Sequence, residues 1–127
     1  MPRTSPTGVV FFAHGSSIET ANEAVREVAR AAAAHANLEL WQAAFLENGR
    51  PDLPQAVARL VEQGARRIVI VPYFLTLGLH LQRDLPRIAA DLARTHKDTE
   101  IICGEPLDGH PALVEILAER VRQASEG

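Results

Sequence analysis

Two histidines of this chain each follow an apolar run, at a point where a buried strand would end. His14 closes the stretch VVFFAH, and His80 lies in YFLTLGLHLQRDLP, just past a second apolar run. A neutral imidazole binds divalent transition metals, and two such ligands leave coordination positions open for the donors of a substrate. The same ring accepts protons near neutral pH. The pair is therefore a candidate for metal capture combined with proton removal.

The predicted surroundings of the two histidines favour the metal-binding form of the ring. Both lie where a helix is expected to begin, and the positive end of a helix dipole disfavours the imidazolium form. A histidine that ends a strand is equally typical of a hydrogen-bonded turn, so both interpretations stay open. His35, His96 and His110 fall at predicted helix ends, and we interpret them as surface or structural residues.

Three charged residues are further candidates near the same edge. Glu47, in AFLENGRPDLP, follows another apolar run and could balance a cation or relay protons. Arg50 and Arg83 carry paired donors that suit the carboxylates of a substrate. All three would also be ordinary as solvated surface charges.

The serine after HG and the apolar segment FLTLGL complete the candidate set. Ser16 could be read as a nucleophile beside His14, but the chain has neither a G-x-S-x-G elbow nor a phosphate loop. We therefore expect Ser16 to offer its hydroxyl and backbone N–H at a helix start. The apolar side chains of FLTLGL either pack under the sheet or line an apolar pocket, because their exposure would cost solubility.

Strand and helix patterns alternate along the whole chain. Because right-handed crossovers link such units, we predict an α/β fold: a four-stranded parallel sheet of order 2-1-3-4 with helices on both faces, in three layers. In this order the first and third strands are neighbours, so His14 and His80 would share one crevice at their carboxyl ends. The predicted strands are Val9–Phe12, Leu38–Phe45, Arg67–Tyr73 and Glu100–Cys103, and the predicted helices are Glu19–Ala34, Leu53–Gln63, Leu81–Arg94 and Pro111–Gln123.

Length and composition exclude several classes of protein. The 127 residues, 46% hydrophobic, predict one domain over residues 1–127. A net charge of -3 offers no field that would attract nucleic acid or a membrane surface. The start of the chain lacks the pattern of a signal peptide, so we expect a cytoplasmic protein. Because Cys103 is the single cysteine, a metal would need nitrogen and oxygen ligands.

Four segments together carry a resemblance to a known family. The segments AHGSS, AFLENGRPDLPQAV, GARRIVIVPYFLTLGLHLQRDLP and EPLDGHPALVEIL stand in this order over residues 8–118. In type and spacing they resemble the small single-domain sirohydrochlorin cobaltochelatases of cobalamin synthesis, which are similar to sirohydrochlorin ferrochelatases. The resemblance implies a chelatase-like fold and an ATP-independent enzyme without a nucleotide cofactor. Its reaction would insert a divalent metal, Co²⁺ first, into sirohydrochlorin or a related tetrapyrrole, with Fe²⁺, Ni²⁺ or Zn²⁺ as alternatives.

The resemblance also implies roles for individual residues. His14 would be the proton acceptor and a metal ligand, with His80 as the second ligand. To these we add Glu47 as a relay, from its position near the same edge. The chain departs from the family at Arg50, where relatives often carry an acidic residue, and at Ser17, where they often carry arginine. Small members of the family are homodimers, which implies a second copy here. The resemblance implies substrate contacts at Arg50, Leu75, Thr76, Leu77, Gly78 and Leu79, and from their chemistry and position we also expect Ser16 and Arg83 to contact the substrate.

Two other functions stay open on the sequence alone. A carrier that binds metal or tetrapyrrole without turnover would use much the same residues. A hydrolase that pairs Ser16 with His14 would need no metal.

Overall fold

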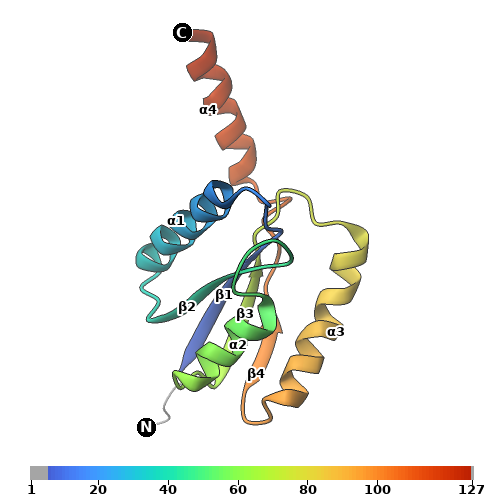
Figure 1. Cartoon of the computed structure of the whole chain (residues 1–127). Helices are drawn as coiled ribbons and strands as arrows, with labels where there is room; N and C mark the ends of the chain where they lie inside the picture. Colours follow the sequence, from blue (N-terminus) through green and yellow to red (C-terminus); the bar gives the residue numbers. More distant parts are fainter. Residues whose placement is uncertain (1–5, 127) are drawn as a thin grey trace.

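The structure is a computed structural model, and it describes residues 6–126. Strands and helices alternate along these residues (Figure 1). The elements are β1 (Thr7–Ala13), α1 (Glu19–His35), β2 (Leu40–Phe45), α2 (Leu53–Glu62), β3 (Arg67–Pro72), α3 (Leu79–Thr95), β4 (Glu100–Cys103) and α4 (Ala112–Glu126). Among these residues, no helix is long and apolar enough to cross a membrane.

The four strands form one parallel sheet of order β2-β1-β3-β4, which confirms the predicted topology. β1 lies between β2 and β3, with Phe12 level with Ala44 on one side and with Pro72 on the other. The three strands therefore end at one edge of the sheet. The loops that follow them bring residues 14–18, 46–52 and 73–78 to that edge.

The two faces of the sheet are covered unequally. Val10, Phe12, Ile68 and Ile70 are at most 2% exposed and form one core with buried residues of α2 and α3. Successive side chains of a strand point to opposite faces, so the residues between them face the α1 side. There α1 packs mainly against β2, and Phe11, Val69, Val71 and Ile102 stay only half-buried.

α4 stands apart from the rest of the fold. Figure 1 shows it projecting beyond the sheet and the other three helices. None of its fifteen residues is buried. The helix itself was predicted, but its projection away from the sheet was not.

α3 begins two residues earlier than predicted. The apolar stripe Leu81, Leu85, Ala89 and Leu92 suggested a start at Leu81, but the first turn precedes the stripe, and the Gln82 N–H donates to the Gly78 carbonyl at 2.9 Å. His80 therefore lies inside the helix. Pro86 lies in the interior of the same helix.

The start of α2 offers a direct test of local stability. The Asp52 carboxylate accepts from the Gln55 N–H at 2.9 Å, and the Gln55 side chain accepts from the Asp52 N–H at 3.0 Å. This capping box satisfies two backbone donors at the helix start. We expect Asp52→Ala to lower the free energy of unfolding by about 1 kcal/mol in urea denaturation. Asp98→Ala, outside any helix, is the control, and an equal loss in both variants would contradict the capping role.

Candidate active site

His14 is the first residue after β1, and its side chain is 61% exposed. Its Nδ1 lies 3.1 Å from the Gly15 carbonyl oxygen. A carbonyl only accepts, so we assign the ring proton of neutral His14 to Nδ1. Nε2 then keeps its lone pair and is free to bind a cation or take a proton. Metal-binding histidines commonly fix their second nitrogen on a backbone carbonyl in this way.

Glu47 faces the open nitrogen of His14. One of its carboxylate oxygens lies 3.7 Å from Nε2, and the Glu47 side chain is 56% exposed. A carboxylate at this distance can balance a cation on the imidazole or pass a proton to water. The structure thus brings together the two residues predicted to be catalytic.

An apolar wall stands beside the imidazole. The buried Phe74 ring meets His14 edge-on with centroids 6.3 Å apart, and it packs in the same manner on Phe12. The rings of Phe74 and His14 border a cavity of about 350 Å³, whose lining includes His14, Ser16, Val25, Tyr73, Phe74 and Leu75. A metal-binding nitrogen therefore borders a mostly apolar space.

The loops after β1 and β2 touch through their backbones. The Leu46 N–H donates to the Ala13 carbonyl at 2.9 Å, and the Glu47 N–H donates to the His14 carbonyl at 3.0 Å. Gly15 has φ +92°, and a Cβ there would lie 1.8 Å from the Glu47 carbonyl oxygen. Only glycine fits such a close approach at a positive φ. The glycine of HGSS is therefore needed for loop contact.

Ser16 is engaged in holding the loop. Its Oγ accepts from the Ile18 N–H at 3.0 Å, as expected for a residue near a helix start. Within residues 6–126, no hydrogen bond joins Ser16 to His14. The geometry gives no support to a serine hydrolase.

His80 lies on a different segment from the His14 cavity. It is the second residue of α3, is exposed, and is not among the residues that line the cavity at His14. The prediction that both histidines begin a helix was wrong for His14, because Ile18 caps α1 and leaves His14 in the preceding loop. In the described part of the chain, no group of three or more His, Cys, Asp or Glu side chains is arranged to hold a metal. The shared role of the two histidines stays a prediction.

The FLTLGL segment fulfils the two predicted roles only in part: Phe74 and Leu77 pack on the core, Leu75 borders the cavity at His14, and Leu79 is exposed. Leu77 is half-buried against the core, and its N–H lies 3.4 Å from an Asp108 carboxylate oxygen. Leu75 and Leu79 point outward and are 71% and 76% exposed. Thr76 and Gly78 are exposed between them. Leu77 thus anchors the segment to the core, and the side chains of Leu75 and Leu79 remain exposed to solvent.

A polar recess adjoins Glu47 on its other side. This cavity of about 480 Å³ includes Glu19, Arg26 and Arg50 in its lining. Arg26 donates to Glu19 at 2.7 Å, and this hydrogen bond, aided by one from Asn22, lowers the pKa of the Glu19 carboxyl below its ordinary value. Arg50 is exposed, with a nitrogen 4.0 Å from Asp52, and Arg83 is exposed on α3. Sequence reasoning missed Arg26, because helical spacing alone did not show that its side chain reaches the loop after β2.

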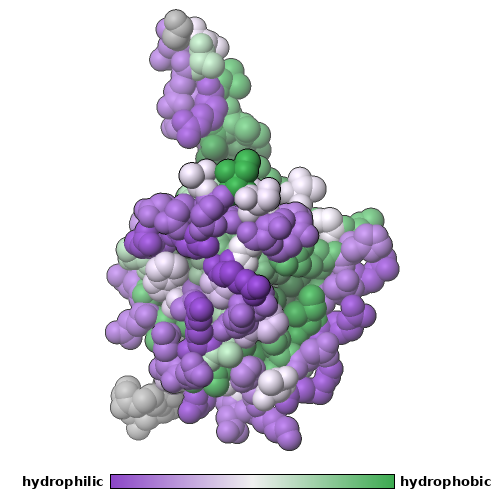
Figure 2. All heavy atoms as spheres, viewed as in Figure 1, coloured by the Kyte–Doolittle hydropathy of each residue, from purple (hydrophilic) through white to green (hydrophobic). Residues whose placement is uncertain are grey.

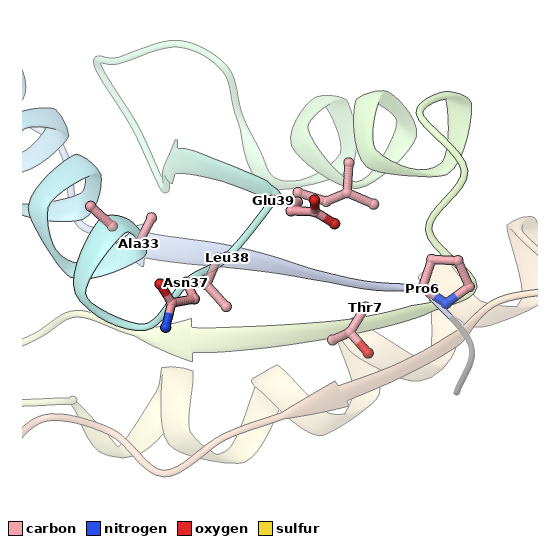
Figure 3. Close-up of a pocket in the computed structure, with 8 residues that line it drawn as sticks. Pro6, Thr7, Ala33, Asn37, Leu38 and Glu39 are labelled. Carbon is pink, nitrogen blue, oxygen red and sulfur yellow. The ribbon is translucent and has the colours of Figure 1, made fainter. Parts of the chain in front are cut away.

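A larger cavity lies at the opposite edge of the sheet. Figure 3 shows it between the end of α1 and the beginnings of the first two strands, and its volume is about 660 Å³. None of the predicted site residues lines it. Ligands of open α/β sheets bind at the carboxyl ends of the strands, so we assign the site to the His14 edge.

Comparison with known proteins decides the family. The CbiX family model matches residues 8–124. The chain belongs to the CbiX family. A sirohydrochlorin cobaltochelatase of Sulfolobus acidocaldarius is 33% identical, over 92% of this chain and 91% of the relative. A sirohydrochlorin ferrochelatase of Priestia megaterium is 30% identical, over 92% of this chain but 44% of the relative.

A solved CbiX-family structure supports the same assignment. The crystal structure of a CbiX protein of cobalamin biosynthesis from Marinobacter aquaeolei has a TM-score of 0.83 and 29% identity, covering 95% of this chain and 98% of the other. These findings confirm the resemblance to sirohydrochlorin cobaltochelatases that the sequence motifs indicated.

The contact at Gly15 predicts a specific sensitivity. We expect Gly15→Ala to separate the two loops and to lower the melting temperature more than Gly64→Ala does. Gly64 is the matched control, because its φ is also positive, at +105°, but nothing lies within 4 Å of an added Cβ. Thermal denaturation followed by circular dichroism measures both variants. Equal losses would show that the backbone angle matters and the loop contact does not.

Proposed function

We propose that this CbiX-family protein inserts a divalent metal into sirohydrochlorin, with Co²⁺ as its metal substrate. The proposal rests on the surroundings of the two ring nitrogens of His14. Its Nδ1 is fixed on a carbonyl, and its Nε2 is open toward Glu47 and beside an apolar cavity. The sirohydrochlorin chelatases among its relatives supply the substrate class.

In this proposal His14 and Glu47 divide the proton chemistry. Metal insertion forms bonds from the ring nitrogens to the metal and releases two N–H protons. Nε2 of His14 first holds the metal. Once the metal has passed to the ring nitrogens, Nε2 accepts the two protons one after the other, and the Glu47 carboxylate, 3.7 Å away, passes each to water. His80 acts as the second ligand that presents the metal to the ring.

The apolar surfaces and the arginines recognise the substrate in this scheme. Leu75 and Leu79 have the exposed apolar area needed to support the face of a flat ring. Arg50 and Arg83 offer paired donors to its peripheral carboxylates. Ser16, Thr76, Leu77 and Gly78 complete the proposed contact surface.

The choice of Co²⁺ rests on how much of each relative's length this chain matches. The cobaltochelatase matches this chain over nearly its full length, whereas the ferrochelatase matches over less than half of its own. Imidazole and carboxylate ligands also suit Fe²⁺, Ni²⁺ and Zn²⁺, so affinity alone does not select the metal. The assignment of Co²⁺ is therefore tested by comparing the insertion of these metals into sirohydrochlorin when they compete in one assay.

Removal of either histidine tests the function. We expect His14→Ala to abolish insertion of Co²⁺ into metal-free sirohydrochlorin, because both a ligand and the proton acceptor are lost. His80→Ala should keep part of the rate, because only metal presentation is lost. The absorbance change of the tetrapyrrole measures the rate, and His35→Ala at the end of α1 is the control.

Two results would redirect the assignment. A wild-type rate no faster than the uncatalysed control would favour a carrier that binds without turnover. Wild-type rates in both His14→Ala and His80→Ala would refute the proposed site.

We further propose that the working form is a homodimer built through α4. One side of α4 carries Val114, Leu117 and Val121, which are three and four residues apart and are 64–69% exposed. Its polar side carries Glu115, Glu119 and Arg122. An amphipathic helix of this kind normally buries its apolar side against another surface.

The same chain has an uncovered apolar surface of matching character. Beside α1 lies a cavity of about 320 Å³, and its lining includes Phe11, Val28, Val71 and Pro106. Figure 2 shows an apolar region where α4 leaves the body. A parallel sheet is normally covered on both faces, so α4 of a second copy suits this open half. Reciprocal exchange of two identical helices gives a closed symmetric pair.

Light scattering coupled to size-exclusion chromatography tests this arrangement. We expect the wild type to elute as a dimer and both Leu117→Glu, on α4, and Val28→Glu, on the uncovered surface, to elute as monomers. A charge in either half of an apolar interface opposes its burial. Glu119→Arg on the polar side of α4 is the control. A monomeric wild type would contradict the reciprocal arrangement. So would a result in which only one of the two variants becomes a monomer.

A further inference from the structure

Asn22 is a buried side chain that touches both loops of the candidate active site. It lies in the first turn of α1 and is 1% exposed. An amide withdrawn from water destabilises a fold unless its polar atoms find partners. The partners of Asn22 therefore indicate what the residue does.

The hydrogen bonds of Asn22 join two loops that are far apart in sequence. Its Oδ1 accepts from the Ser16 N–H at 2.9 Å, and its Nδ2 donates to the Ser16 carbonyl at 2.9 Å. Nδ2 also lies 3.2 Å from the Asn48 carbonyl and from a Glu19 carboxylate oxygen. Ser16 is two residues from His14, and Asn48 follows Glu47. One amide thus ties together the segments that carry the proposed proton acceptor and its relay.

The two reactive side chains do not hold each other in place. Both are more than half exposed. A neutral His14 forms no ion pair with Glu47, and a protonated one would form an exposed pair across 3.7 Å, which contributes little to stability. Their separation is instead set by the backbones that carry them. Those backbones are joined by the Glu47 N–H to His14 carbonyl bond and by Asn22.

We infer that Asn22 is a positioning residue that sets the distance between His14 and Glu47 for proton transfer during metal insertion. This inference rests on the proposed function. A residue that served only the start of α1 would need its bonds to Ser16 and Glu19 alone. The hydrogen bond to Asn48 is the one that reaches the loop after β2. It is this bond that gives Asn22 its proposed role.

Two substitutions separate this role from simple stabilisation of the helix. Asn22→Asp keeps the shape and the acceptor for the Ser16 N–H, but it loses the donors that face the carbonyls of Ser16 and Asn48. Asn22→Ala loses all four contacts. We expect both to lower kcat by about 10- to 100-fold, as a small misplacement of a catalytic group does. KM for the tetrapyrrole should change less, although Asn22 also holds Ser16 of the proposed contact surface.

A double variant and a matched control sharpen the test. Once the two groups are misaligned, Glu47→Gln should lower kcat in the wild type but have little further effect in Asn22→Ala. Val57→Ala is the control for stability, because Val57 is fully buried in α2, outside the residues assigned to the site. It should lower the melting temperature and leave kcat unchanged.

Amide hydrogen exchange measures, in the absence of substrate, whether Asn22 holds the loops after β1 and β2 together. The Glu47 N–H should lose protection in both Asn22 variants, and the Ser16 N–H should lose it in Asn22→Ala. Unchanged protection, a wild-type kcat in both variants, or multiplicative effects in the double variant would each overturn the inference. A wild type that inserts no metal would count against the proposed function, and the exchange data alone would then decide whether Asn22 joins the loops.

Discussion

The close contact between the loops after β1 and β2 is the constraint on which the proposed chemistry depends. Two neighbouring parallel strands deliver their loops to the same edge, and the missing Cβ of Gly15 lets the loop backbones meet. Backbone hydrogen bonds then extend the strand pairing by two residues beyond the sheet. His14 and Glu47 stand at the end of that extension. Their proximity is therefore a property of the backbone, and their exposed side chains remain free to meet a substrate.

The architecture could be predicted from the sequence because its signals are local and repeated. Apolar runs such as RIVIVPY alternate with helical stripes, and handedness rules leave few strand orders for such a chain. His14 and Glu47 followed from that order, since each comes directly after one of two neighbouring strands. The chelatase resemblance rested on whole segments and covered nearly the same residues as the family match.

Other features depend on tertiary contacts that the sequence does not display. Asn22 and Arg26 look like ordinary polar residues of an amphipathic helix, and only the folded loops show that they reach residues 48 and 50. The start of α3 was misplaced because the apolar stripe begins at Leu81, two residues inside the helix. The position of α4 could not be predicted either, since an apolar stripe shows that a helix needs a partner but not where that partner lies.

The isolation of α4 has a consequence for the secondary structure itself. A helix of fifteen residues without tertiary support is only marginally stable in water, and most helical stability in proteins comes from packing of an apolar side. Within residues 6–126, the sheet and the other helices bury no residue of α4. If α4 packs on a second copy as proposed, that contact would supply the missing support. Folding of this segment would then be coupled to association, and its order would depend on protein concentration.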